Sequence, residues 1–132
     1  SVGNPSATTT TTYDAVAPAT PTGLATTVGT GASVSLDWAD NTEADFDEYF
    51  VFANSVDSGW PVAPYTDTTL LIAKTKASRF VDINVTIGTI RYWRILAEDT
   101  SGNKSAPTAT ASATPTGAAS GPTPAPPAAP TK

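Results

Sequence analysis

Polar and hydrophobic residues alternate most regularly in residues 33–38, where Val34, Leu36 and Trp38 are separated by Ser and Asp residues. A period of two is the pattern of a β-strand with one buried face, so the three apolar side chains are predicted to point into a core. Trp38 is expected to contribute the largest single block of buried area. Residues 24–28 alternate more loosely and end at a Gly-Thr-Gly turn, which predicts a first edge strand.

Two other stretches, residues 48–53 and 90–97, are apolar on both alternating sets of positions. Such a strand is usually central in its sheet, covered by the core on one side and by neighbouring elements or a partner on the other. The second stretch follows a Gly-Thr turn and ends at a Ser-Gly-Asn turn. We predict that residues 88–105 contain the strand around which the rest of the chain is organised.

Residues 68–73, 78–83 and 105–113 predict three further short strands, and Pro107 marks the last one as an edge strand because proline cannot donate a ladder hydrogen bond. Seven short strands separated by turn signals predict an all-β protein with two packed sheets. The residues expected to form its core are Leu24, Val34, Leu36, Trp38, Tyr49, Val51, Phe80, Trp93, Ile95 and Ala97.

The two ends of the sequence differ in composition from the predicted domain, which covers residues 19–114. Residues 1–18 are rich in Thr, Ala and Pro, and residues 115–132 are rich in Pro and Ala. Such segments bury too little apolar surface to offset the entropy lost on ordering. We interpret the first as a linker or arm and the second as a semi-rigid polyproline II spacer. Docking of Tyr13 and Val16 on a partner would make the first segment an anchoring arm.

Composition excludes several classes of function. The net charge of −5 argues against nucleic acid as a partner, and the lack of a long apolar run argues against membrane insertion. The chain has no Cys and no His, so it lacks thiolate chemistry and the usual general base. We predict no enzyme activity and no cofactor. The absence of Met predicts that the chain is processed or excised from a longer one.

Six carboxylates fall within residues 37–48. Paired carboxylates hydrolyse glycosides only in a cleft that raises one pKa, which a solvated loop does not offer. Calcium is the better functional hypothesis, because Asp40, Asn41, Glu43 and Asp45 supply hard oxygen ligands. Their spacing matches no EF-hand loop, so we predict a solvated acidic loop and no metal site.

Trp60 and Tyr65 are the candidates for contact with a ligand or partner. Flat aromatic side chains at the edge of a sheet can stack on sugar rings or anchor a protein partner. The alternative is structural: Trp60 and Pro61 fold over the edge of the sheet and close the core.

Taken together, these motifs resemble the fibronectin type III domain of the bacterial and phage kind. The similarity covers about residues 19–114 and rests on Pro21-Thr-Gly-Leu24, the Trp38 strand with the acidic loop after it, a Gly88-Thr89 turn, and the segment from Ala97 to Ser105. It implies an immunoglobulin-like sandwich of three strands on four, with Trp38 buried between the sheets. The family usually has a corner-closing tyrosine three residues after the glycine, where this chain has Arg91. Either Tyr92 takes that role, or the Arg91 guanidinium binds backbone carbonyls.

From this resemblance we expect a non-catalytic interaction or spacer module in an extracellular or virion assembly, such as a phage capsid or tail. Its partner would be a neighbouring protein or a cell-surface glycan. One alternative is an accessory domain of a secreted polysaccharide-degrading enzyme. Another is a sugar-binding adhesin, which requires Trp60 or Tyr65 to be exposed. A virion protein is expected to end at Lys132, whereas an enzyme fragment would continue into a catalytic domain.

Overall fold

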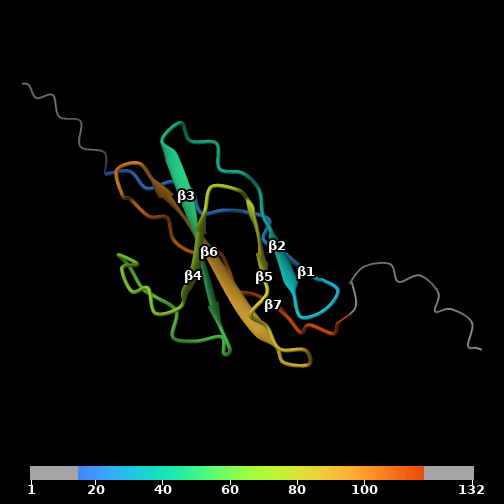
Figure 1. The fold of residues 1–132 in the computed structure, drawn as a ribbon. Coiled ribbons are helices and arrows are strands. Elements are labelled where there is room, and N and C mark those ends of the chain that lie inside the picture. The colour runs from blue at the N-terminus through green and yellow to red at the C-terminus, as the bar shows by residue number, and fades with distance from the viewer. Residues whose placement is uncertain (1–14, 118–132) are drawn as a thin grey trace, which may run out of the picture.

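The computed structural model describes residues 15–117, so the expectations for Tyr13 and for most of both terminal segments lie outside the described residues. Seven strands form two antiparallel sheets (Figure 1). The smaller sheet has the order β1 (Ala25–Val28), β2 (Val34–Asp37) and β5 (Arg79–Asp82). The larger has the order β4 (Leu71–Thr75), β3 (Phe46–Asn54), β6 (Arg91–Asp99) and β7 (Ala111–Ala113). The predicted all-β sandwich of three strands on four is confirmed.

The central and edge positions of the strands follow the sequence pattern. β3 and β6, which are apolar on both faces, are the two central strands of the larger sheet, while β1 and β7 lie at edges. The last strand is shorter than predicted. Before Ala111 the chain bonds to β6 through side chains as well as backbone. The amides of Ser105 and Thr108 donate to β6 carbonyls at 2.8 Å, and the hydroxyls of the same two residues accept the amides of Ala97 and Ile95. Pro107 between them has no N–H to donate. Residues 15–117 include no helix that could cross a membrane.

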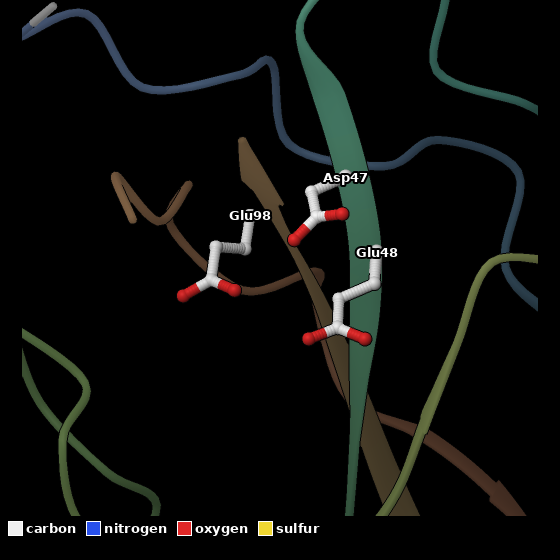
Figure 2. A group of neighbouring side chains, drawn as sticks. All are labelled: Asp47, Glu48 and Glu98. Carbon is white, nitrogen blue, oxygen red and sulfur yellow. The ribbon is translucent and has the colours of Figure 1, made fainter. Parts of the chain in front are cut away.

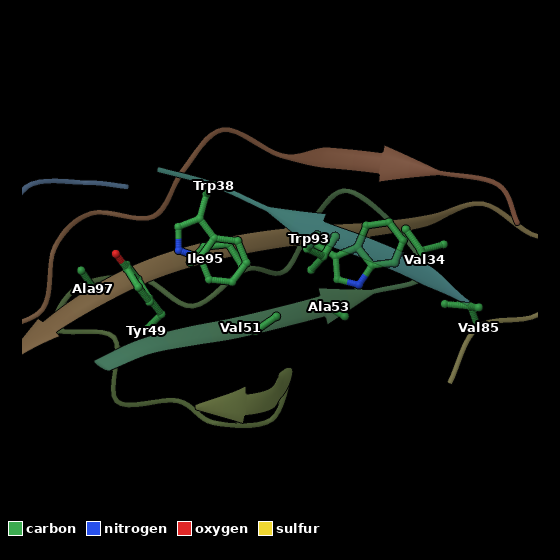
Figure 3. Close-up of a cluster of buried hydrophobic side chains, with 10 residues drawn as sticks. Val34, Trp38, Tyr49, Val51, Ala53, Val85, Trp93, Ile95 and Ala97 are labelled. Atoms are coloured by element: carbon green, nitrogen blue, oxygen red, sulfur yellow. The ribbon is translucent and has the colours of Figure 1, made fainter. Parts of the chain in front are cut away.

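The main core lies between the two sheets (Figure 3). The rings of Trp38 and Tyr49 meet edge to face, with their centroids 5.2 Å apart. Leu24 and Phe80 are half-buried and pack against this cluster. The buried residues of the cluster are Val34, Leu36, Trp38, Tyr49, Val51, Ala53, Val85, Trp93, Ile95 and Ala97.

A second, smaller core covers the outer face of the larger sheet. Phe50, Phe52 and Leu96 point away from the main core and are nevertheless buried. The loop between β3 and β4, residues 55–70, lies over them and contributes Trp60 and Tyr65. The apolar second face of the two central strands is therefore covered by the protein's own loop.

The described chain begins and ends at opposite ends of the sandwich (Figure 1). The proximal end comprises residues 15–22, 39–45 and 99–106, where the backbone amide of Ala39 donates to the carbonyl of Thr22 at 2.8 Å. The distal end comprises residues 29–33, 83–90 and 115–117. There Pro115 is buried, its carbonyl accepts the Gly88 amide at 2.8 Å, and Gly117 pairs with Gly31. The packed chain thus continues three residues into the range assigned to the tail.

Candidate functional site

A buried carboxylate holds the corner between β5 and β6. Asp82 accepts hydrogen bonds from the Asn84 amide at 2.9 Å, from Arg91 Nε at 2.9 Å and from Trp93 Nε1 at 2.8 Å. Arg91 therefore binds a carboxylate, which differs from both alternatives drawn from the sequence, Tyr92 and the backbone carbonyls. Phe80, two residues earlier on the same strand and predicted to face the core, was the signal that Asp82 shares that face.

The acidic loop anchors the incoming chain. Glu43 Oε2 accepts the Ala19 amide at 2.8 Å, and Asn41 Nδ2 donates to the Ala19 carbonyl at 2.8 Å. Asn41 also donates its side-chain amide to Glu43 and its backbone amide to the Tyr49 hydroxyl. The hydrogen bond from Ala19 is the main reason that the pKa of Glu43 lies below its ordinary value. Of the other two candidate metal ligands, Asp40 lines the same small pocket as Asn41 and Glu43, and the backbone carbonyl of Asp45 accepts the Thr100 amide at 2.9 Å.

Three other carboxylates converge on the outer face of the larger sheet (Figure 2). The register shifts between Phe46 and Glu48, so Asp47 is an extra, bulged residue and lies on the same side as Glu48. Glu98 stands directly opposite Glu48 on β6. One oxygen of each of the three carboxylates lies within 4.8 Å of the others. Asp47 and Glu48 belong to the six neighbouring carboxylates of the sequence, but neither was a candidate ligand. Glu98 lies outside that group, and only strand pairing brings it there.

Two lysines offset the charge of these carboxylates. Lys76 Nζ lies 2.9 Å from Asp47 Oδ1, and Lys104 Nζ lies 3.0 Å from Glu98 Oε2. The hydrogen bond with Asp47 is the main cause of the raised pKa of Lys76. Without these cations, like charges opposite each other would destabilise the pairing of β3 with β6.

Trp60 is built into the second core. Its indole N–H donates to Asp57 at 2.8 Å, and the Arg94 guanidinium lies over its ring at 5.0 Å. Asp57 also accepts the Thr110 hydroxyl at 2.7 Å, which with the Trp60 bond keeps the pKa of Asp57 low. The ring is half-buried, with one face covered by an arginine. Trp60 therefore has a structural role in the second core, on the outer face of the larger sheet. Its contact with a ligand or partner stays a prediction.

Tyr65 lies beside a groove of about 290 Å³ at the proximal end. Its backbone is in the left-handed region, with φ of 61°, an uncommon conformation for a bulky residue. Val62 and Val16, near the groove in sequence, are 77% and 75% exposed, the highest values among the large hydrophobic residues of the described chain. The groove is lined by Ala15, Ala17, Ala63, Pro64, Tyr65, Gly102, Asn103 and Lys104.

Solved structures resemble this fold, although no protein-family model and no curated protein sequence matches the chain. An Fn3-like protein from Clostridium thermocellum is 29% identical, with a TM-score of 0.55; the match covers 74% of this chain and 92% of that one. A human fibronectin type III domain, from fibronectin type III domain containing protein 3, is 16% identical with a TM-score of 0.60, over 78% and 90% of the two chains.

A third similar structure is the spore cortex lytic enzyme SleM of Clostridium perfringens, which is 22% identical with a TM-score of 0.53. The match covers 72% of this chain but only 27% of the enzyme. The human domain and the lytic enzyme support the fold alone, whereas the similarity to the Clostridium thermocellum protein extends over nearly all of that chain. With the sheet order β1-β2-β5 packed on β4-β3-β6-β7, the chain is identified as containing a fibronectin type III-like domain.

Proposed function

We propose that the chain is a non-catalytic interaction and spacer module of an extracellular or virion assembly. The observation that carries this proposal is that the chain enters the sandwich at the proximal end and leaves it at the distal end. A folded body inserted in this way separates whatever precedes it from whatever follows it by the length of the sandwich. A spacer needs that geometry.

The chain is held by hydrogen bonds and packing both where it enters the sandwich and where it leaves it. At the proximal end Ala19 is held through both its amide and its carbonyl by Glu43 and Asn41, and Thr20 Oγ1 donates to the Ala106 carbonyl at 3.0 Å. At the distal end Pro115 is buried and Gly117 pairs with Gly31. These contacts fix the direction in which each flanking segment departs, which supports a positioning role.

A second candidate is an accessory domain of a secreted polysaccharide-degrading enzyme. One observation favours it: the similar domain of the spore cortex lytic enzyme forms part of a much longer chain. In such a protein the same geometry would hold a catalytic domain away from another module.

The experiment that separates the two candidates is made on the protein in its source material. Intact mass spectrometry and sedimentation would give the native mass and the size of the particle that contains it. A module of a large assembly is expected to sediment with that assembly and to have residues 1–18 protected from protease. A polypeptide that continues into a catalytic domain, with both terminal segments readily cleaved, would contradict the assembly proposal and support the accessory domain.

A further inference from the structure

We propose that the groove beside Tyr65 binds the Pro/Ala-rich segment, residues 118–132, of a second copy of this chain. This inference rests on the proposed module role and names the partner for one end of the module. It would make the contact between copies head-to-tail, joining the distal end of one copy to the proximal end of the next.

The groove exists only in the folded protein, because three segments far apart in the sequence form its walls. They are residues 15–17, 63–65 and 102–104. Apart from Tyr65, Asn103 and Lys104, its lining consists of Ala, Pro and Gly residues. Short side chains allow the backbone of an extended peptide to approach closely, and the Tyr65 ring offers it an apolar face with a polar edge.

Two exposed aliphatic residues adjoin the lining residues of the groove in the sequence. Val16 lies between two of the lining alanines, and Val62 precedes a third, and both side chains are largely exposed. Covering aliphatic surface of this kind removes it from water at a gain of roughly 25 cal/mol per Å². An uncharged, apolar segment would make use of this surface, whereas a strongly charged one would not.

Charge at the proximal end restricts the partner further. Lys104, the charged residue among those that line the groove, is paired with Glu98, and the nearby loop carries Asp40, Glu43 and Asp45. An acidic peptide would be repelled there, while an uncharged or weakly basic one would not. Residues 118–132 comprise five Pro, five Ala and five other residues, and their one charged side chain is that of Lys132.

The chemistry of this segment suits an aromatic-sided groove. Proline-rich peptides adopt polyproline II geometry before they bind, so they lose little conformational entropy in a groove that carries an aromatic side chain. In that geometry 15 residues would span about 47 Å at 3.1 Å per residue. The segment is therefore long enough to reach from one copy into a neighbouring one.

The position of Gly117 favours a second copy over the same copy. The chain leaves at the distal end, where the Gly117 backbone lies against Ile87, and the groove is at the proximal end. A segment that returned to its own groove would have to fold back along the whole sandwich. A neighbour placed end to end presents its groove directly, in a heterologous contact that repeats from copy to copy.

The test is an NMR titration of the ¹⁵N-labelled full-length chain with an unlabelled synthetic peptide of residues 118–132. We expect saturable shift changes at the amides of Ala17, Ala63, Tyr65 and Gly102. The variant Ala17→Arg fills the groove and is expected to weaken binding by about tenfold or more. The matched control is Ala44→Arg, which adds the same side chain at an exposed position outside the groove.

Three results would overturn the inference. One is the absence of shift changes at the groove, and another is equal binding by the two arginine variants. The third is a groove already filled in a dilute monomer, which would assign the segment to the same copy. If the peptide fails to bind but the protein still sediments with a large assembly from its source, only this inference fails. If the peptide binds but the native polypeptide proves to continue into a catalytic domain, the assembly proposal fails and this inference does not.

Discussion

At the scale of single residues, Asp82 accounts for the largest departure from the sequence motif. The family resemblance places a tyrosine where Arg91 stands, and the structure replaces a tyrosine hydroxyl bond with an ion pair from Arg91 Nε to Asp82. The side chain of Asp82 is 1% exposed and that of Arg91 is 23% exposed. A carboxylate taken so far out of water is stable only because Arg91, Trp93 and the Asn84 amide satisfy it.

We expect Asp82→Asn to lower the free energy of unfolding by about 3 kcal/mol, the lower end of the range for breaking a buried ion pair, because Arg91 keeps some contact with solvent. The amide has the same shape but puts a donor in place of one of the two oxygens, both of which accept hydrogen bonds in Asp82. Urea unfolding would measure the change. Asp37→Asn, at an exposed carboxylate on the neighbouring strand, should change stability by no more than about 0.5 kcal/mol. A loss below about 1 kcal/mol at Asp82 would show that the pair is dispensable.

Glu43 makes the anchoring of Ala19 dependent on pH. Its folded-state pKa lies below the ordinary value of 4.5, chiefly because the ionised carboxylate accepts the Ala19 amide. The bond therefore stabilises the protein at pH values above 4.5 and is lost as the pH falls through the lower, folded-state pKa. We expect the Ala19 amide resonance to move with a midpoint below 4.5, and Glu43→Gln to abolish that movement. A midpoint above 4.5 would contradict this assignment.

At the scale of the elements, the bulge in β3 determines the face of the sheet on which its acidic side chains lie. Without the extra residue at Asp47, successive side chains would point to opposite faces. With it, Asp47 and Glu48 share the outer face with Glu98, and lysines from two loops reach over them. The irregularity thus gathers like charges and the cations that offset them at one end of the sheet.

We expect EDTA to leave the melting temperature of the protein unchanged. Lys76 and Lys104 form ion pairs with carboxylate oxygens that a calcium ion would need. In the acidic loop, Asn41 and Glu43 form hydrogen bonds with Ala19. Differential scanning calorimetry with and without EDTA, at constant ionic strength, would measure this. A clear fall that added calcium reverses would contradict this expectation and establish a calcium site in the protein.

The strands and most of the core were predictable from the sequence because alternation of apolar residues is a local signal. The spacing of two residues between Val34, Leu36 and Trp38 predicts that all three side chains point to the same face. The orientation of Asp82 could have been inferred from Phe80 in the same way. The partners of Asp82 and Glu98 could not be, since Arg91, Trp93 and Glu48 lie on other strands. The groove at Tyr65 was also beyond prediction, because its walls are three segments that only the folded chain brings together.

At the scale of the whole molecule, β1 and β7 close one side of the sandwich. Thr26 Oγ1 donates to the Ser112 carbonyl at 3.1 Å, so the edge strands of the two sheets meet there. Both strands run from the proximal to the distal end, as their pairing with β2 and β6 requires. The chain enters just before the first and leaves just after the second.

Tension applied between the two termini would therefore slide β1 and β7 past each other along their length. All contacts between them would share the load at once and resist as a set. We expect single-molecule pulling through residues 1 and 132 to require more force than pulling through Ala32 and residue 132, because both of those attachment points load the distal end and peel strands apart one contact at a time. Equal forces in the two geometries would contradict this expectation. A domain loaded in shear keeps its neighbours at a fixed separation even when they are drawn apart.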